Sequence, residues 1–337
     1  MTREDAVATA ASVPLDTRGQ GAITRRLRRA SMSGDMPRIW MAFAAAICVW
    51  SIAVGFEGRV ASYVGTELTF STILPLGAAA MSEMFIIVIG DIDISIGFFI
   101  GLANAVAARF LAPDPLWGAL LLVALVAAYM LMGVLIQVLT MPALLGTLAA
   151  SFIWEGIGLA LYPMPGGTAP QWLLSLYNSQ PPFVPFPIIA LAVLAVPTTW
   201  YIRRTRQGAL LRGFGSDPRA TATFGISALK MRLIAYGLAG VFGVIGGLAV
   251  TAISNSASPT SSAPLTLLAI AAAIVGGSEF SGGFAVPVGA ILGAIAVSLA
   301  TTVLTFVNVP SNYQDAVVGL ILLGALTLRM LVRRVER

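Results

Sequence analysis

The chain has 337 residues, of which 58% are hydrophobic and only 10% are charged. So few polar groups cannot cover the surface of a water-soluble domain of this size, so that class is excluded. The sequence contains no histidine, which excludes a histidine-based catalytic triad, metal site or proton relay, and its single cysteine, Cys48, excludes an intramolecular disulfide.

The basic residues are concentrated in three clusters. Seven lie within residues 3–38, seven within 203–232 and four within 329–337, out of twenty in the chain. Short loops rich in Lys and Arg stay on the cytoplasmic side of a membrane, so we expect all three clusters, and with them both termini, in the cytoplasm. The net charge of +5 therefore indicates membrane topology rather than nucleic-acid binding.

Residues 1–37 are polar and precede the first apolar stretch. Their charged region, which includes 25–29 (RRLRR), is longer than that of a signal peptide. We expect a disordered, basic cytoplasmic arm over 1–37, a membrane domain over 38–331 and a cytoplasmic tail over 332–337.

The apolar stretches predict about ten transmembrane helices, and therefore an all-α polytopic membrane protein. The expected ranges are 39–56, 70–90, 95–111, 116–138, 143–162, 186–201, 232–252, 264–277, 284–306 and 313–330. Six crossings precede the central basic cluster and four follow it, as cytoplasmic positions for all three clusters require. Residues 163–185 are then an outer loop and 203–230 a cytoplasmic loop.

Several predicted spans are interrupted. Pro75, Pro187 and Pro197 fall within spans, and 254–262 (SNSASPTSS) divides a long uncharged stretch into two. Such breaks either kink helices or mark the discontinuous helices of transport sites, and the sequence leaves both possibilities open.

Acidic residues in or near the spans are candidates for a substrate pathway. Glu83 and Glu155 lie inside predicted spans, where a charge is costly and usually faces a cavity or a partner. Their carboxylates are suited to accepting hydrogen bonds from a polyol, and equally to bracing helices or being protonated. Asp91 and Asp93 lie near a cytoplasmic boundary, and we expect them to cap the following helix together with Ser95.

A glycine-rich turn occupies residues 276–283 (GGSEFSGG). Its candidate structural residues are Gly276, Gly277, Ser278, Gly282 and Gly283. A phosphate-binding loop requires a glycine followed by lysine, whereas the single lysine, Lys230, follows Leu229. We therefore expect no ATP hydrolysis and no cofactor or metal on this chain, and interpret these glycines as a tight turn with close helix contact.

Three segments carry a family resemblance. Residues 90–97 (GDIDISIG), 208–226 (GALLRGFGSDPRATATFGI) and 276–283 occur in that order. Together they resemble the membrane subunit of bacterial ABC importers of the ribose/galactose/xylose permease family, whose corresponding features are a Gly-Gly-Ile-Asp-Leu-Ser-Val-Gly turn, a cytoplasmic small-residue helix ending in Gly-Ile, and a Gly-Gly-x-Ser-x-x-Gly-Gly turn. The similarity extends from about residue 40 to the C-terminus.

The chain also departs from the family pattern. Asp91 stands where the family has a second glycine, the usual Asn is replaced around Ser216-Asp217, and 143–151 (ALLGTLAAS) matches the family poorly. These departures leave the family intact but argue against an ordinary hexose or pentose as the substrate.

The resemblance implies a coupling helix that seats on an ATPase subunit. The residues that it assigns to this contact are Ser216, Asp217, Pro218, Ala220, Ala222, Gly225 and Ile226. Ser216 and Asp217 are suited to the helix start, Pro218 to the first turn and Gly225 to the end.

The resemblance also implies the partners. Two cytoplasmic ATPases with ATP and Mg, an external solute-binding protein and a second permease subunit would assemble in the bacterial cytoplasmic membrane to import a sugar or polyol. The alternatives are a branched-chain amino-acid type ABC permease, an ion-coupled secondary transporter with Glu83 and Glu155 as coupling sites, and an intramembrane enzyme, which the lack of histidine disfavours.

Overall fold

The computed structural model describes residues 17–310 together with 313, 316, 319–320 and 324, and side chains from Met36 onward. The protein is all-α: 77% of it is helical, and in the described part the single β pairing is one isolated bridge between Gly166 and Ala257. The sequence-based fold class is confirmed.

Seven of the described helices are long and apolar enough to cross a membrane. They are α2 (Thr17–Phe56, apolar over Met36–Phe56), α3 (Tyr63–Ile87), α5 (Pro115–Val138), α6 (Ala143–Leu161), α8 (Phe186–Arg204), α11 (Ala228–Ser254) and α13 (Pro287–Phe306). Two shorter apolar segments are α4 (Ile96–Val106), which continues as a π-helical turn over Ala107–Leu111, and α12 (Leu265–Val275). The remaining short helices are a 3-10 turn (Gly58–Ala61), α7 (Gln171–Tyr177), α9 (Arg206–Ser216) and α10 (Pro218–Thr223).

Nine of the ten expected spans coincide with an apolar helix, and the tenth, 313–330, lies almost wholly outside the described residues. The count of ten and the cytoplasmic termini therefore stay predictions. The second span begins at Tyr63 rather than near 70 because the Ser62 hydroxyl caps the helix by accepting the Gly65 N–H. Where the sequence predicts a disordered arm over 1–37, the structure has helix from Thr17; residues 1–16 lie outside the described part.

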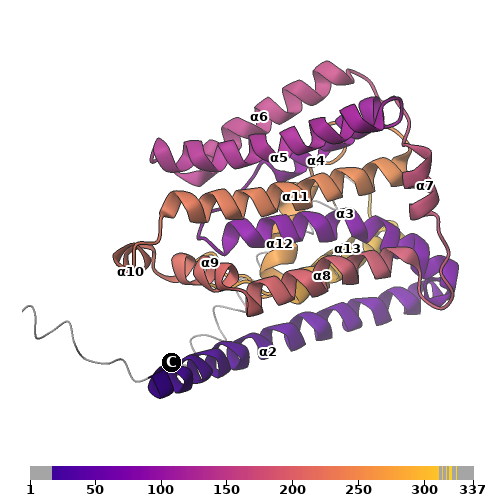
Figure 1. The fold of residues 1–337 in the computed structure, drawn as a ribbon. Helices are drawn as coiled ribbons and strands as arrows, with labels where there is room; N and C mark the ends of the chain where they lie inside the picture. The colour runs from indigo at the N-terminus through magenta and orange to yellow at the C-terminus, as the bar shows by residue number, and fades with distance from the viewer. Residues whose placement is uncertain (1–16, 311–312, 314–315, 317–318, 321–323, 325–337) are drawn as a thin grey trace, which may run out of the picture.

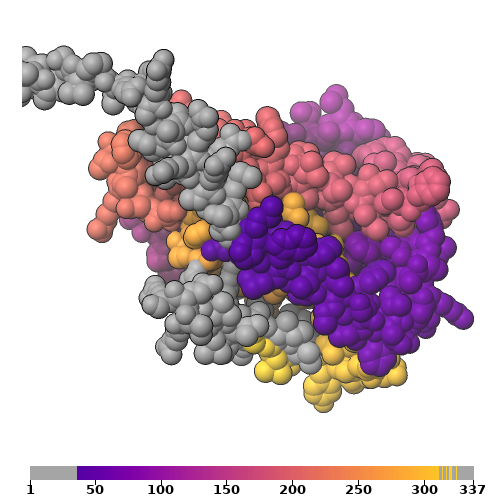
Figure 2. Space-filling model, turned by 90° about the horizontal axis from the view of Figure 1, so that it is seen from below, coloured from indigo at the N-terminus to yellow at the C-terminus, as the bar shows by residue number. Residues whose placement is uncertain are grey.

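The long helices run side by side, so the molecule has two distinct ends (Figure 1). Helices α9 and α10 and the start of α2 lie at one end, and α7 lies at the other (Figure 1). The central basic cluster belongs to the first end, which the positive-inside rule assigns to the cytoplasm. Viewed from below, α2 lies across the outside of the bundle (Figure 2), where it packs against α13.

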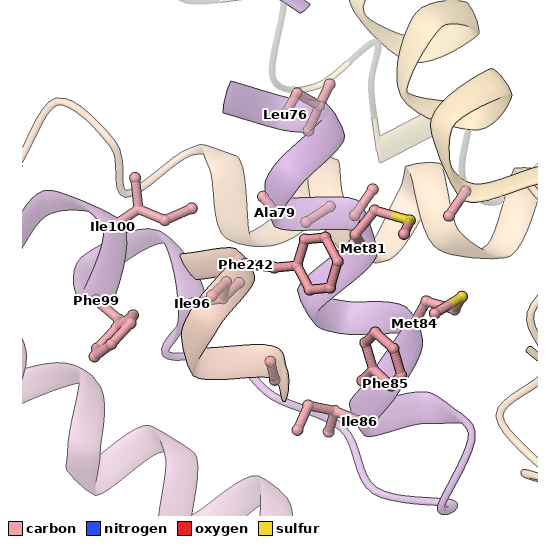
Figure 3. Close-up of a cluster of buried hydrophobic side chains, with 14 of the residues drawn as sticks. Leu76, Ala79, Met81, Met84, Phe85, Ile86, Ile96, Phe99, Ile100 and Phe242 are labelled. Atoms are coloured by element: carbon pink, nitrogen blue, oxygen red, sulfur yellow. The ribbon is translucent and has the colours of Figure 1, made fainter. Parts of the chain in front are cut away.

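Helix α3 forms the centre of the core. All its residues from Ile73 to Ile87 are buried, and it packs against α11, α12, α13 and α8. Figure 3 shows Phe85 of α3 next to Phe242 of α11, and the two rings lie 5.7 Å apart. The run Ala78–Ala79–Ala80 allows the neighbouring helices to approach closely, as small residues do in membrane bundles.

The segment 255–264 between α11 and α12 is not helical. Asn104 of α4 fixes it: the side-chain amide donates to Thr251 Oγ1 (2.9 Å) and to the Ser256 carbonyl (3.0 Å), and accepts the Ser258 N–H (2.9 Å). The polar break predicted at 254–262 is therefore a discontinuity held by buried hydrogen bonds, and α12 starts only after it.

Candidate functional site

The three segments that carry the family resemblance meet at the cytoplasmic end of the bundle. The Gly283 N–H donates to the Val88 carbonyl at 2.8 Å. Gly215 packs against the same carbonyl, and a Cβ added to it would lie 2.6 Å from the Gly283 nitrogen. A Cβ on Gly282 would lie 2.5 Å from the Gly215 carbonyl oxygen. We call this contact of Val88, Gly90, Gly215, Gly282 and Gly283 the glycine junction.

Backbone packing explains why the turn 276–283 is rich in glycine. Gly282 and Gly283 have φ of +77° and +83°, a region that favours glycine. Gly276 packs directly on the backbone of Gly289 in α13, a Cβ on Gly277 would lie 3.0 Å from the Arg38 Cβ, and Ser278 is buried. The structure thus places these candidate residues in a close-packed turn between α12 and α13.

Arg38, near the start of the apolar part of α2, is tied to this turn. Its guanidinium forms an ion pair with Glu279 (2.7 Å) and lies 3.8 Å from the centre of the Phe284 ring. The Ser281 hydroxyl donates to the other Glu279 oxygen at 3.3 Å. Sequence reasoning missed this contact, because 241 residues separate the partners and the acid in the turn was its single signal.

Asp91 lies in the connection 88–95, outside the membrane-spanning helices. Its carboxylate accepts hydrogen bonds from Arg232 (3.0 Å) and from the Tyr236 hydroxyl (3.2 Å), both on α11. Burial raises the pKa of Asp91, although the Arg232 guanidinium and the Tyr236 hydroxyl act in the opposite direction. The ion pair therefore fastens the α3–α4 connection to α11 without fully offsetting the cost of burial.

Asp93 connects the start of α4 to its neighbours. Its carboxylate accepts the Ser95 N–H at 2.6 Å and a hydrogen bond from the Tyr129 hydroxyl of α5. Ser95 occupies the N-cap position without a side-chain cap bond, and Thr266 of α12 accepts the Gly97 N–H (3.0 Å) in the first turn, so the expected capping of α4 by Asp91, Asp93 and Ser95 is not seen. The Asp93 N–H points to Glu83 Oε1 (3.4 Å), while Glu83 Oε2 is buried with no partner among the described residues.

The structure thus brings Glu83, Asp91, Asp93 and Ser95 together and leaves Glu155 apart, half-buried on α6. Glu83, Asp91, Asp93 and Ser95 are buried. Their side chains bond to neighbouring parts of the bundle, as residues that hold helices together do. Their contact with a transported solute stays a prediction.

The segment expected to contact an ATPase forms α10. Asp217 is the cap, since its carboxylate accepts the N–H groups of Arg219 (3.0 Å) and Ala220 (2.9 Å), whereas Ser216 ends α9 and donates to the Arg212 carbonyl (3.0 Å). Gly225, with φ of +73°, ends the helix.

Helix α10, including Pro218, Ala220 and Ala222, has no buried residue. Phe224, which directly follows it, is 82% exposed, and Ile226 is half-buried. Sequence reasoning missed Phe224, although an aromatic residue in a polar, basic loop is a usable signal. It also missed α9, whose buried Leu211 and Phe214 fix α10 to the bundle.

Among the described residues, no group of three or more His, Cys, Asp or Glu side chains could hold a metal ion. The bundle combines long apolar helices with two shorter apolar helices, α4 and α12, and an exposed cytoplasmic helix, α10. This combination defines a multi-pass membrane transport subunit.

Comparison with known proteins identifies the family. Residues 65–326 match the family described as the branched-chain amino acid transport system / permease component, and the chain belongs to this family. No solved structure matches.

Individual relatives are moderately similar. The ribose import permease protein of Haemophilus influenzae is 26% identical over 73% of this chain and 79% of its own. The autoinducer 2 import system permease protein of Enterobacter sp. (strain 638) is 27% identical over 85% of both chains. The ribose import permease protein of Bacillus subtilis is 29% identical over 75% of this chain and 80% of its own.

The chain is accordingly a permease subunit of an ABC importer and a multi-pass protein of the bacterial cytoplasmic membrane. The resemblance stated from the three glycine motifs is confirmed. The family description names branched-chain amino acids, whereas these three relatives carry ribose or autoinducer 2 in their names.

Proposed function

We propose that this chain forms half of the membrane pathway for a sugar or polyol, and that separate ATPase subunits drive transport through α10. The names of the ribose import relatives support the substrate class. The arrangement of α9, α10 and the glycine junction supports the proposal that the ATPase acts through α10.

One observation carries the coupling proposal: α10 is fully accessible, yet its base is rigidly attached. Phe224, at the end of the bundle that carries the central basic cluster, is 82% exposed. Gly215, two residues before the Asp217 cap, packs directly on Val88 and Gly283. A push on Phe224 and α10 is therefore delivered to the connection between α3 and α4 and to the connection between α12 and α13. An exposed aromatic of this kind is a typical anchor for a protein partner.

We infer the remaining partners from the family to which the chain belongs. An external binding protein delivers the solute at the end that carries α7, and a second permease subunit completes the pathway. ATP and Mg act on the ATPase, since this chain contains no phosphate-binding loop. The chain itself acts without catalysis.

The coupling proposal is tested with Phe224→Ala in the complex reconstituted with its ATPase and binding protein. We expect weaker ATPase binding and loss of ATP-dependent uptake. Phe183→Ala is the matched control, because Phe183 is also an exposed aromatic, at 95%, on the outer loop. A Gly225→Val variant should insert normally but hydrolyse ATP without transport, because valine resists a φ of +73°. Normal uptake in the Phe224 and Gly225 variants would refute the assignment.

The substrate class is tested by offering ribose, xylitol and leucine to the same vesicles. ATP-dependent uptake of leucine alone would favour the branched-chain amino-acid alternative. Uptake driven by a proton or sodium gradient without the ATPase would favour a secondary transporter.

A further inference from the structure

The non-helical segment 255–264 reaches the middle of the membrane. The Pro259 carbonyl packs on Gly101, and a Cβ on Gly97 would lie 2.5 Å from the Ser262 carbonyl oxygen. These two glycines lie about 15 and 21 Å below the outer end of α4 at Leu111, at 1.5 Å per residue. In a hydrocarbon core of about 30 Å, that depth is central.

Helix α6 borders the segment at the same depth. A Cβ on Gly158 would lie 2.9 Å from the Pro259 Cβ and 3.9 Å from the Leu102 Cα. One turn toward the cytoplasm, the rings of Trp154 and Phe99 are 5.7 Å apart, so α6 and α4 run in parallel. Glu155 is therefore level with the residues that directly follow Pro259.

The helical period shows which side of α6 Glu155 occupies. Gly146 faces Ile136 of α5, and Trp154 faces α4. At about 100° per residue, Gly158 is turned about 40° from Trp154, away from the Gly146 side. Glu155 is turned about 60° further in the same direction. Since Gly158 touches Pro259, Glu155 lies on the flank of α6 that borders the non-helical segment.

Polar groups collect at this place, and some of them have no partner. The side chains of Thr260 and Ser261 are exposed on the single chain, and the Ser261 hydroxyl donates to the Ser258 carbonyl at 2.8 Å. Ser262 is 2% exposed, and neither its Oγ nor the buried Nε1 of Trp154 has a hydrogen-bond partner among the described residues. Non-helical backbone is tolerated at this depth only against protein or a water-filled cavity, never against lipid.

We propose that Glu155, Thr260 and Ser261 form a polyol-binding site in the wall of the translocation pathway, with the Ser262 hydroxyl beneath it. This inference rests on the proposed function and names the residues that would bind the solute. A carboxylate accepts hydrogen bonds from two solute hydroxyls, while Thr and Ser hydroxyls both donate and accept. The second permease subunit forms the opposite wall, which explains why the site is open on one chain.

Water access is tested without knowledge of the solute. Single cysteines replace Thr260, Ser261 and Leu267 in a Cys48→Ser background, and the complex in membranes is treated with a charged, membrane-impermeant thiol reagent. Leu267 is the control because it is 61% exposed but lies on the apolar helix α12. Thr260→Cys and Ser261→Cys should react at least tenfold faster than Leu267→Cys. Equal rates for all three positions would overturn the water-lined site.

Solute contact is tested by ATP-dependent uptake of ribose, xylose and xylitol. Glu155→Gln should lower uptake about tenfold or more, and Thr260→Val several-fold, with ATP hydrolysis retained, because hydrogen bonds to a charged group are the stronger ones. Glu67→Gln and the exposed Thr72→Val serve as matched controls and should transport normally.

The outcomes distinguish failure of the polyol-binding site from failure of the proposed function. Normal uptake in Glu155→Gln and Thr260→Val overturns this site and leaves the proposed function standing. A wild-type complex that imports none of the three hydroxylated solutes overturns the proposed function and this inference together.

Discussion

Replacing Gly215 with alanine tests the glycine junction most directly. The new Cβ would overlap the Val88 carbonyl oxygen and lie 2.6 Å from the Gly283 nitrogen. Backbone atoms cannot rotate away as a flexible side chain does, so the Val88–Gly283 hydrogen bond of 2.8 Å has to open. Overpacking costs about 1–3 kcal/mol and the lost hydrogen bond about 0.5–1.5 kcal/mol. We therefore expect a loss of about 2–4 kcal/mol of stability.

Gly213→Ala is the matched control, because Gly213 lies two residues away in α9. Its added Cβ would meet only the Thr221 Cγ2 at 3.7 Å, an ordinary contact. Alanine there should stabilise the helix by up to about 1 kcal/mol. Thermal unfolding of the purified protein in detergent measures both variants. We expect a fall of several degrees for Gly215→Ala and none for Gly213→Ala; equal midpoints would refute the backbone-contact argument.

Three further predictions concern charged contacts at the cytoplasmic end. Arg232→Gln should destabilise the protein by about 3–5 kcal/mol, because it leaves the buried Asp91 carboxylate without its cation. Adding Asp91→Asn should raise the thermal unfolding midpoint part of the way back, and no such rise would argue against the pairing. Asp217→Ala removes the cap of α10 and should cost about 0.5–2 kcal/mol locally, seen as faster amide exchange at Arg219 and Ala220, whereas Asp217→Asn should retain protection. Glu279→Gln should loosen α2 from the glycine turn, so that a cysteine at the buried Ala42 of α2 reacts faster with a thiol reagent in that variant than in its Glu279 parent; unchanged reactivity would speak against the contact.

The membrane-spanning helices were predictable because the bilayer imposes a length and a composition. Residues 116–138 were expected and α5 covers Pro115–Val138, since Asp114 caps the helix and an uncharged run fills it. Helix α12 shows the limit of that rule: its apolar pattern was recognised, but not that it is too short to cross alone. It starts at Leu265, after the non-helical segment that Asn104 binds, and ends at Val275, before the glycine-rich turn.

The candidate site was predictable in its motifs but not in its contacts. The three glycine segments were recognisable one by one, whereas their meeting at Val88, Gly215 and Gly283 depends on tertiary packing. Helix α9 has a weak local signal, and its burial depends on its packing against α8, α11 and that junction. The proximity of Glu83 to Asp93 depends on the break between α3 and α4, which spacing along the chain does not reveal.

The shortness of α12 also constrains how the chain is assembled during synthesis. Its 11 residues span only about 16 Å, roughly half of the hydrocarbon core, so the insertion machinery has no complete crossing to release into lipid at that point. The polar segment before it is hydrogen-bonded to Asn104 and to Gly166, which are made some 150 and 90 residues earlier. The last quarter of the polypeptide must therefore enter against an already inserted α4, and a fragment starting at α12 would lack these partners.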